Sequence, residues 1–244
     1  MASAMYTRNI TPEPPREKHE MTKKEKWKNW WDYHLWHVVI GIIAAALVIY
    51  FIIEAVSNVK PDYQIAIMTD TMLPTGISDA LGTALEAYAD DFNGDGKVVV
   101  QINEYEIPLD TEAATVDANT LMANVTRLMA DGQEGESTIF ITNHPAEYAE
   151  NYSLFAKNDG TTPETASDLK TDFGYKWSDC PVLTSLELGE VEYYGGTSAL
   201  DVQDYLKDFY LFRRAYSGTL LERKEDKQVY YESSMKILDA LTAK

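Results

Sequence analysis

The sequence predicts an α/β protein with one transmembrane helix near its N-terminus, followed by a mainly parallel-sheet, three-layer domain. The helix is predicted by an uncharged apolar run at 35–53, LWHVVIGIIAAALVIYFII. At about 1.5 Å of rise per residue, a helix of this length crosses a hydrocarbon core of roughly 30 Å. The domain is predicted because short apolar runs alternate with helical patterns after residue 62, which is typical of parallel strands joined by crossover helices.

The orientation of the span follows from the basic residues around it. In the 20 residues before it, 15–34, there are six basic residues, and in the comparable window at 54–73 only Lys60 follows; the six are Arg16, Lys18, Lys23, Lys24, Lys26 and Lys28. Tryptophans at 27, 30, 31 and 36 cluster on the same side, as amphipathic rings do at the headgroup level. We therefore expect a single-pass protein of the cell membrane, with its N-terminus in the cytoplasm and its C-terminal domain extracellular.

Two alternatives exist for this run. The first is a cleaved signal peptide, with 23–28 as its charged region and Ala55-Val56-Ser57 as a small-x-small cleavage site. The second is a buried core helix, which is disfavoured because apolar residues occupy every face and aromatic residues with lysines flank the run.

The regions on either side of the span differ in composition. Residues 1–21 contain several prolines and few apolar side chains, so we expect a disordered cytoplasmic tail. Thr22 and Glu25 form a capping-box pattern, so we expect a juxtamembrane and transmembrane helix over 22–58. Pro61 lies in a short linker at 59–62, and the extracytoplasmic α/β domain covers 63–244.

The predicted elements of the domain are clearest in its first half. We expect strands at 63–68, 97–105 and 137–142, and helices at 77–88, at 118–129 with an end at Gly132, and from Pro145 onward. Residues 153–197 are harder to interpret and leave open a second small lobe, with candidate strands at 183–188 and 191–194. Ser198 is expected to cap a helix that extends to Phe212, and a last helix is expected at 226–243.

Charge divides the chain at the span. The formal net charge is −18, with +2 in residues 1–53 and −20 in the remainder. An outer domain this acidic repels phosphate backbones, which excludes nucleic acid and favours cations, cationic peptides or a basic protein surface as partners. Cys180 is the single cysteine, so the chain has neither an internal disulfide nor a cysteine-based metal site.

The carboxyl ends of the predicted parallel strands are the candidate ligand site, because ligands of open α/β sheets bind at that edge. Hydroxyl, carboxylate, amide, imidazole and aromatic groups gather there and suit a small polar or cationic ligand. The alternative is that such loops are polar in any soluble domain. The candidate residues are Thr69, Asp70, Thr71, Tyr105, Asn143 and His144.

A loop at 91–98, DFNGDGKV, matches the first part of an EF-hand calcium loop. Asp91, Asn93 and Asp95 are the candidate calcium ligands. The twelfth position, which needs a bidentate carboxylate, is Ile102, so any calcium site is expected to be weak. The favoured alternative is an Asx-rich turn, in which the side chains bind their own backbone.

Catalytic motifs are absent from the sequence. It contains no nucleophile elbow, phosphate loop, zinc helix or glycine-rich dinucleotide turn. We therefore expect no enzymatic activity and no cofactor beyond a weak calcium ion.

Several segments resemble the first lobe of bacterial extracellular solute-binding proteins of the type II periplasmic-binding fold. QIAIMTD and KVVVQINEY resemble its first two strands, ISDALGTALEAYADDF its first helix, LMANVTRLMADGQEGESTIFIT its helix–glycine–strand segment and YYESSMKILDALTA its closing helix. The N-terminal KWKNWWDYHLWH with a single span also resembles membrane proteins of Firmicutes. The chain has no room for a full second lobe, which such proteins use to clamp a ligand.

Two functions are consistent with these observations. The first is a membrane-anchored, solute-binding-like extracytoplasmic domain coupled to a membrane or cell-surface protein partner. The alternative is a non-catalytic scaffold or accessory subunit of a membrane assembly.

Overall fold

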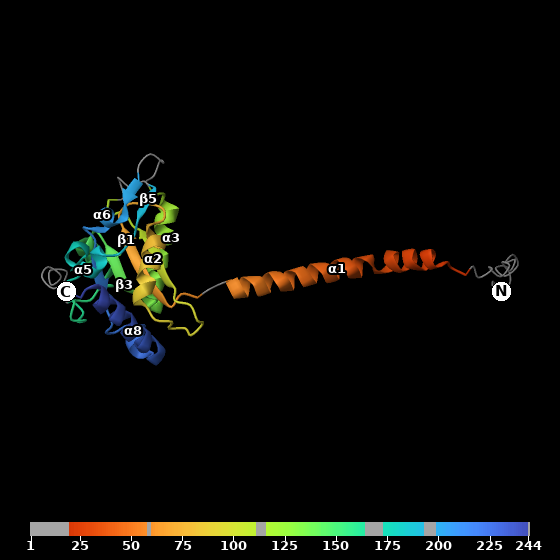
Figure 1. The fold of residues 1–244 in the computed structure, drawn as a ribbon. Helices are drawn as coiled ribbons and strands as arrows, with labels where there is room; N and C mark the ends of the chain where they lie inside the picture. Colours follow the sequence, from red (N-terminus) through yellow and green to blue (C-terminus); the bar gives the residue numbers. More distant parts are fainter. Residues whose placement is uncertain (1–19, 58–59, 111–115, 164–172, 193–198, 244) are drawn as a thin grey trace, which may run out of the picture. The chain divides into compact units, whose positions relative to one another are not determined.

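The computed structural model describes residues 20–57, 60–110, 116–163, 173–192 and 199–243. The chain divides into two units, Met1–Asn58 and Val59–Lys244. Within the described residues the second unit contains a five-stranded sheet with helices on both faces (Figure 1). The elements are α1 (Lys23–Ser57), β1 (Tyr63–Thr69), α2 (Ile77–Leu85), η1 (Glu86–Tyr88), β2 (Val100–Glu106), α3 (Ala118–Glu134), β3 (Ser137–Thr142), α4 (Pro145–Tyr152), β4 (Tyr175–Lys176), η3 (Trp177–Asp179), α5 (Pro181–Thr184), β5 (Glu190–Glu192), β6 (Ala199–Asp201), α6 (Val202–Leu206), β7 (Tyr210–Arg213), α7 (Leu220–Arg223) and α8 (Glu225–Leu241).

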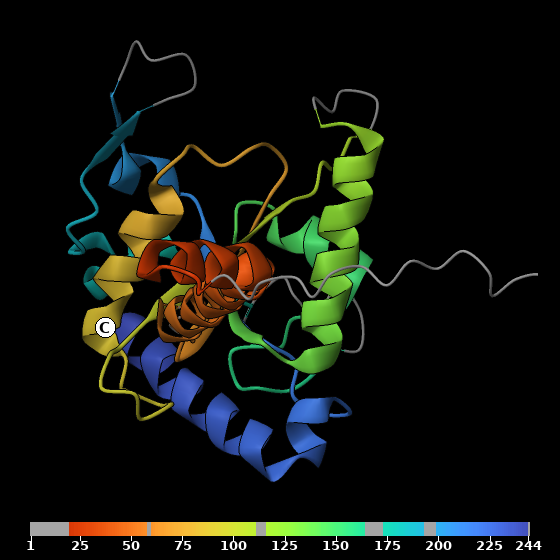
Figure 2. The same cartoon turned by 90° about the vertical axis from the view of Figure 1, so that its right-hand side faces the viewer.

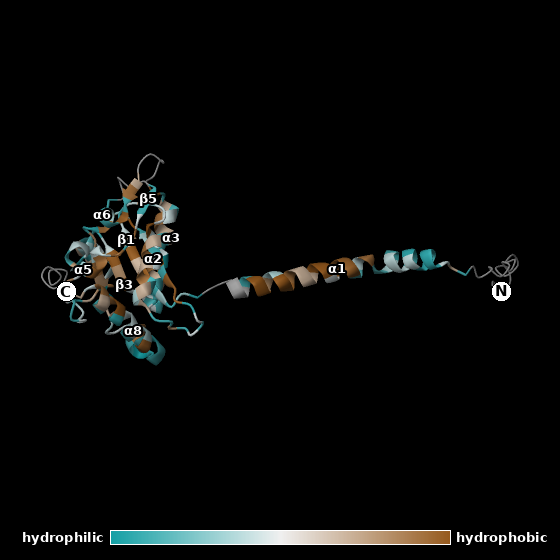
Figure 3. Cartoon of the chain, viewed as in Figure 1, coloured by the Kyte–Doolittle hydropathy of each residue, from teal (hydrophilic) through white to brown (hydrophobic). Residues whose placement is uncertain are grey.

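The first unit is the long helix α1. Its start is the predicted capping box: the Thr22 amide donates to the Glu25 carboxylate at 2.8 Å, and the Glu25 amide donates to Thr22 Oγ1 at 3.4 Å. The helix is hydrophilic in its first turns and apolar beyond them (Figure 3). Residues Lys23–Glu54 are long and apolar enough to cross a membrane by length and composition, a description that a signal sequence also meets.

Three parallel strands form the part of the sheet that the sequence predicts best. The strand order is β2-β1-β3-β7-β4, and β1 pairs in parallel with both β2 and β3. The register places Thr69 beside Glu106 and Met68 beside Thr142, so these strands end at the same edge. The predicted strands at 63–68, 97–105 and 137–142 are thereby confirmed, with the second beginning only at Val100.

Apolar side chains on the two faces of the sheet form two cores. Alternate residues of β1 point to opposite sides: Ile65 and Ile67 pack against α2 and α8, whereas Ala66 and Met68 pack toward α3 and α4. The helices therefore form layers on both faces of the sheet, and Figure 2 shows α3 well separated from α2 and α8. Gly82 on α2 allows this packing, because a Cβ there would lie 2.7 Å from the backbone oxygen of Val100.

The second half of the domain corrects several expectations. The sheet is mixed, since β7 runs antiparallel to both β3 and β4. The helix expected from Ser198 to Phe212 is wrong: Asp201 caps a short α6 that ends at Leu206, and 210–213 is β7. Phe212 lies opposite Phe140 of β3, and this long-range pairing outweighs the local helical spacing.

Other boundaries differ in detail. The candidate strand at 183–188 is wrong, because Pro181 starts the short helix α5, whose final residue is Thr184. Helix α3 passes Gly132 and ends at Glu134, and Gly135, with a φ of 66°, supplies the left-handed cap. Helix α4 begins at Pro145, as expected, and α8 closely matches the predicted last helix.

Some expectations concern residues outside the described ones. These are the disordered tail over 1–19, the start of the linker at 58–59, parts of the candidate second lobe at 164–172 and 193–197, the strand end at 193–194 and the cap at Ser198. The described part of the linker is tied to the domain. Asp62 is buried, and its amide donates to the Val99 carbonyl at 2.9 Å.

Candidate functional site

The order of the parallel strands creates a switch point between β1 and β3. The chain leaves β1 toward β2 on one side, and α3 then carries it back across β1 to β3 on the other side. In open α/β sheets the crevice at such a point, beyond the carboxyl ends of the strands, is the usual ligand site. Asp70 follows β1 and Asn143 follows β3, so both lie there.

Three predicted residues meet at the switch point: Asp70, Asn143 and His144, named here the carboxyl-edge cluster. Asn143 Nδ2 donates to Asp70 Oδ1 at 3.2 Å, and His144 Nε2 lies 3.4 Å from Asp70 Oδ2. The side chains of His144 and Asp70 are 36% and 32% exposed, so solvent reaches both. The His144 amide donates to Thr142 Oγ1 at 3.2 Å, which orients the turn that follows β3.

The cluster presents hydrogen-bond acceptors. Asn143 Oδ1 is shielded from solvent and has no hydrogen-bond partner among the described residues. The orientation of this amide is fixed, because its nitrogen must face the Asp70 carboxylate, which only accepts. An unpaired amide oxygen beside a carboxylate favours a ligand that brings N–H or O–H donors or a positive charge.

Glu106 adds a further carboxylate to this edge. It lies opposite Thr69 in the register of β1 and β2. Burial raises the pKa of Glu106 above its ordinary value. Thr69 itself is buried, and its carbonyl accepts from the Ile107 amide at 2.8 Å, so it shapes the backbone of this edge. Thr71 is exposed.

Tyr148 on α4 belongs to this region and is missing from the predicted set. Its ring meets the His144 ring edge-on at 6.4 Å, and its hydroxyl donates to the Ile107 carbonyl at 2.8 Å. Burial raises the pKa of Tyr148, and the negative charge of Asp70 adds to the effect. The spacing from His144 to Tyr148 is one helical turn after Pro145, a signal that could have identified this tyrosine from the sequence.

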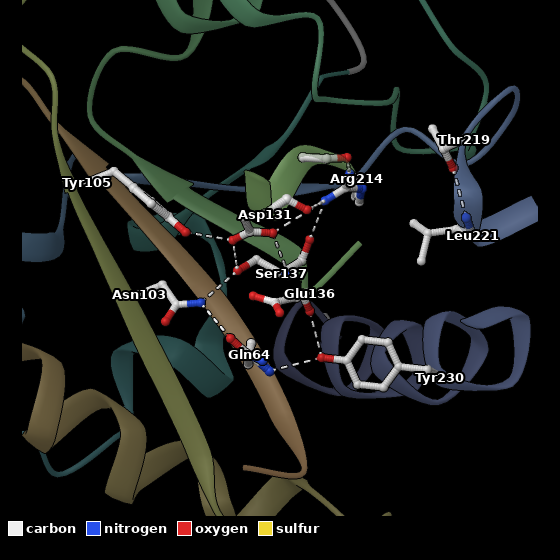
Figure 4. Close-up of polar contacts among 11 residues, drawn as sticks. Gln64, Asn103, Tyr105, Asp131, Glu136, Ser137, Arg214, Thr219, Leu221 and Tyr230 are labelled. Atoms are coloured by element: carbon white, nitrogen blue, oxygen red, sulfur yellow. Dashed lines mark hydrogen bonds and ion pairs between the residues drawn. The ribbon is translucent and has the colours of Figure 1, made fainter. Parts of the chain in front are cut away.

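Tyr105 lies in a different environment from the other candidates. It is 3% exposed, and its hydroxyl donates to Asp131 Oδ2 at 2.8 Å (Figure 4). Arg127 lies over its ring, with Cζ 5.5 Å from the centroid. The strand alternation sends Tyr105 toward α3, so the structure does not bring it together with Asp70.

Asp131 is the centre of a buried polar network (Figure 4). Its carboxylate accepts from the Ser137 amide at 2.8 Å and from Ser137 Oγ at 2.5 Å. Arg214 Nη1 lies 3.6 Å from Asp131 Oδ1 and donates to the carbonyls of Asp131 and Ser137, while Nη2 donates to the Gly132 carbonyl. Burial lowers the pKa of the Arg214 guanidinium, and the charge of Asp131 opposes that effect.

The network continues across the sheet to α8. Asn103 Nδ2 donates to Ser137 Oγ at 3.1 Å and to Gln64 Oε1 at 2.9 Å. The backbone N–H of Gln64 donates to the Tyr230 hydroxyl at 3.0 Å, and this hydroxyl donates to the backbone carbonyl of Glu136 at 2.8 Å. These groups connect α3, three strands and α8, and their hydrogen bonds to one another indicate a structural role.

The candidate calcium loop has the hydrogen bonds of an Asx turn. Asp91 Oδ1 accepts from the amides of Gly94 and Asp95, and Oδ2 accepts from that of Gly96. Asn93 Oδ1 accepts from the Asp95 amide, and Asp95 Oδ1 from the Lys97 amide, both at 2.9 Å. Among the described residues no group of three or more His, Cys, Asp or Glu side chains is arranged to hold a metal ion.

Comparisons with known proteins do not bear on the function of the carboxyl-edge cluster. The cluster combines acceptors, a switch point and partial exposure, which together suit binding of a small donor-bearing ligand. No family model, no curated protein and no solved structure matches this chain.

Proposed function

We propose that this chain is a single-pass membrane protein whose extracytoplasmic domain binds a small ligand carrying N–H donors or a positive charge. The carboxyl-edge cluster is the binding site, and the domain delivers the ligand, or reports its presence, to a membrane or cell-surface partner. The observation that carries this proposal is the part-exposed Asp70 carboxylate at the β1/β3 switch point, with the unpaired Asn143 Oδ1 behind it.

The membrane anchor is supported by the surface of α1. Its apolar side chains are exposed along the helix, with Ile40 at 62%, Val48 at 58% and Ile52 at 57%. A helix that is apolar on all faces requires lipid or protein around it. Lysines before the span and few after it favour a cytoplasmic N-terminus.

The charge of the domain supports the class of ligand. Residues 54–244 carry a net charge of −20, and Asp70 and Glu106 lie at the same edge of the sheet. Such a field attracts cations and repels anions, which favours amines and basic amino acids or peptides over sugar phosphates and carboxylates. The resemblance to one lobe of solute-binding proteins is consistent with this role.

Thermal unfolding of the full chain in detergent tests the proposal. The probe is a panel of small amines and basic amino acids, matched by carboxylates of equal size. A ligand at about 100 times its dissociation constant stabilises the domain by about 2.7 kcal/mol, which shifts the unfolding midpoint by several degrees.

Matched variants distinguish binding at the carboxyl-edge cluster from a general attraction of cations to the acidic domain. Asp70→Asn and Asn143→Leu are expected to abolish the shift, whereas Asp204→Asn, which removes an exposed carboxylate on α6, is expected to retain it. If no cationic compound stabilises the parent, or if all three variants respond alike, this ligand site is refuted.

A scaffold role is the second candidate, because α3 presents exposed apolar side chains. Met122 is 72% exposed and Met129 39% exposed, and Leu109 before the helix is 37% exposed. Methionines on an open surface are suited to protein contacts. A photo-crosslinking residue at Met122, with one at the exposed Glu134 as a control, should capture a partner in intact cells from the first position only.

A further inference from the structure

The first turns of α1, before the uncharged run at 35–53, form a surface on which lysines and tryptophans share one side of the helix. Lys23, Lys24 and Lys28 line a shallow cleft with Trp27 and Trp31. A second cleft, beside Lys26, is lined by Trp27 and Trp30. We call this surface, Lys23 to Trp31 without Glu25 and Asn29, the basic aromatic face.

The aromatic part of this face is continuous and exposed. Trp27 stacks on Trp31 with centroids 5.9 Å apart, and Trp30 stacks on His34 at 4.8 Å. Trp27 is 68% exposed and Trp30 47% exposed. On a helix of 3.6 residues per turn, Glu25 and Asp32 fall on the side opposite to Trp27, where Lys28 at the edge of the face is their neighbour. The tryptophans of this face and the other three lysines lie on the side away from Asp32.

The distance from the apolar run places these groups at headgroup depth. Lys28 precedes residue 35 by about 10 Å along the helix axis and Lys23 by about 18 Å. A headgroup layer extends roughly 5–8 Å beyond the hydrocarbon core, and the potential of an anionic surface extends about 8 Å further. Trp30 and Trp31, about 6–8 Å from residue 35, therefore lie in the headgroup layer, and Trp27 lies just beyond it. Lys26 and Lys28 lie within the field of its phosphates, and the long side chains of Lys23 and Lys24 extend their ammonium groups toward it.

We propose that the basic aromatic face binds anionic phospholipid in preference to zwitterionic lipid. This inference rests on the membrane anchoring in the proposed function, since the face meets headgroups only if 35–53 is inserted. The occupant is lipid because the face is continuous with the span and complementary in charge to a cytoplasmic leaflet. One basic residue near such a surface contributes about a fivefold preference, so four lysines at unequal depths predict a preference of at least that size.

Tryptophan quenching in vesicles tests the inference with the full chain. Four of the five tryptophans lie in α1, and Trp177, fully buried in the second unit, supplies a constant unquenched background. The chain is reconstituted into phosphatidylcholine vesicles that contain brominated phosphatidylcholine or brominated phosphatidylglycerol. Stronger quenching by the brominated anionic lipid, corresponding to at least about a fivefold higher relative affinity, is the expected result.

Two variants of equal charge change complete the test. Lys23→Gln, Lys24→Gln, Lys26→Gln and Lys28→Gln together are expected to remove the preference. The control replaces four exposed lysines of the second unit by Gln and is expected to retain it; these are Lys97, Lys207, Lys224 and Lys236.

The outcomes distinguish this inference from the proposed function. Equal quenching by both lipids in the parent, or a preference that survives loss of the four α1 lysines, overturns the inference and leaves membrane insertion standing. If neither brominated lipid quenches the tryptophans, both the lipid preference and the membrane insertion of the proposed function are overturned.

Discussion

Replacing Asp131 by Asn tests whether the buried network holds the layers of the domain together. The substitution keeps the volume of the side chain and removes its charge and one acceptor atom. The side-chain NH2 group of the new Asn cannot face the backbone N–H of Ser137, because both are donors. It must therefore face the hydroxyl groups of Tyr105 and Ser137, which in the parent donate to Asp131 Oδ2. Arg214, 2% exposed, loses the carboxylate 3.6 Å away.

The expected cost follows from two independent estimates. A hydrogen bond to a charged group contributes about 1 kcal/mol more than a neutral one, and Asp131 accepts three bonds from Tyr105 and Ser137, which gives about 3 kcal/mol. Removing one partner of a buried ion pair costs about 3–5 kcal/mol. The lower end applies, because Arg214 keeps its bonds to backbone carbonyls.

Trp177 provides a specific assay for this variant. With Trp27, Trp30, Trp31 and Trp36 replaced by Phe, its buried indole is the sole tryptophan and reports unfolding of the second unit alone. Urea titration of the full chain in detergent should show a loss of about 3 kcal/mol for Asp131→Asn. Asp204→Asn, an exposed carboxylate paired with a lysine, should leave the midpoint unchanged. A loss below about 1 kcal/mol for Asp131→Asn would refute this view of the network.

Three further predictions use the same assay. Gly82→Ala should cost about 1–3 kcal/mol, because its Cβ meets the Val100 backbone, whereas Gly132→Ala meets only a movable leucine methyl and should be tolerated; equal losses would contradict the packing argument. Burial raises the pKa of Glu106 in the folded domain, so the contribution of Glu106 to the free energy of unfolding falls as pH rises above 4.5. Glu106→Gln should remove that fall, and a variant with the same pH profile as the parent would contradict this assignment. Asp91→Ala should cost about 1–2 kcal/mol equally in calcium and in chelator, since backbone amides occupy its oxygens; a loss seen only in calcium would favour a metal site.

The first half of the domain could be predicted because its signals are local. Strands β1 and β3 are short apolar runs, and β2 alternates between buried and more exposed residues after a run of valines. Each helix has a stripe, a cap or a proline at its start, as at Asp117 and Pro145. Strand β7 could not be predicted in this way. Its four residues continue the helical spacing of Val202 and Leu206, and only the pairing of Phe212 with Phe140 makes them a strand.

The candidate site divides along the same line. Asp70 and Asn143 could be placed together because consecutive parallel strands end at one edge of a sheet. Tyr105 lies near the end of the neighbouring strand β2, but strand alternation directs its side chain toward α3. Its partner there, Asp131, is a polar residue near the C-terminal end of α3 that no apolar periodicity reveals. The unpaired oxygen of Asn143 likewise becomes visible only when every neighbour is in place.

Protease protection in intact cells tests most directly whether α1 holds an extracellular domain on the membrane. The full chain carries one epitope tag at each end, and the cells are treated with external protease before membranes are washed with carbonate. We expect loss of the C-terminal tag and a protected, membrane-bound fragment that retains the N-terminal tag. A C-terminal tag that survives in whole cells, or a mature product that lacks the N-terminal tag before protease is added, would contradict this expectation.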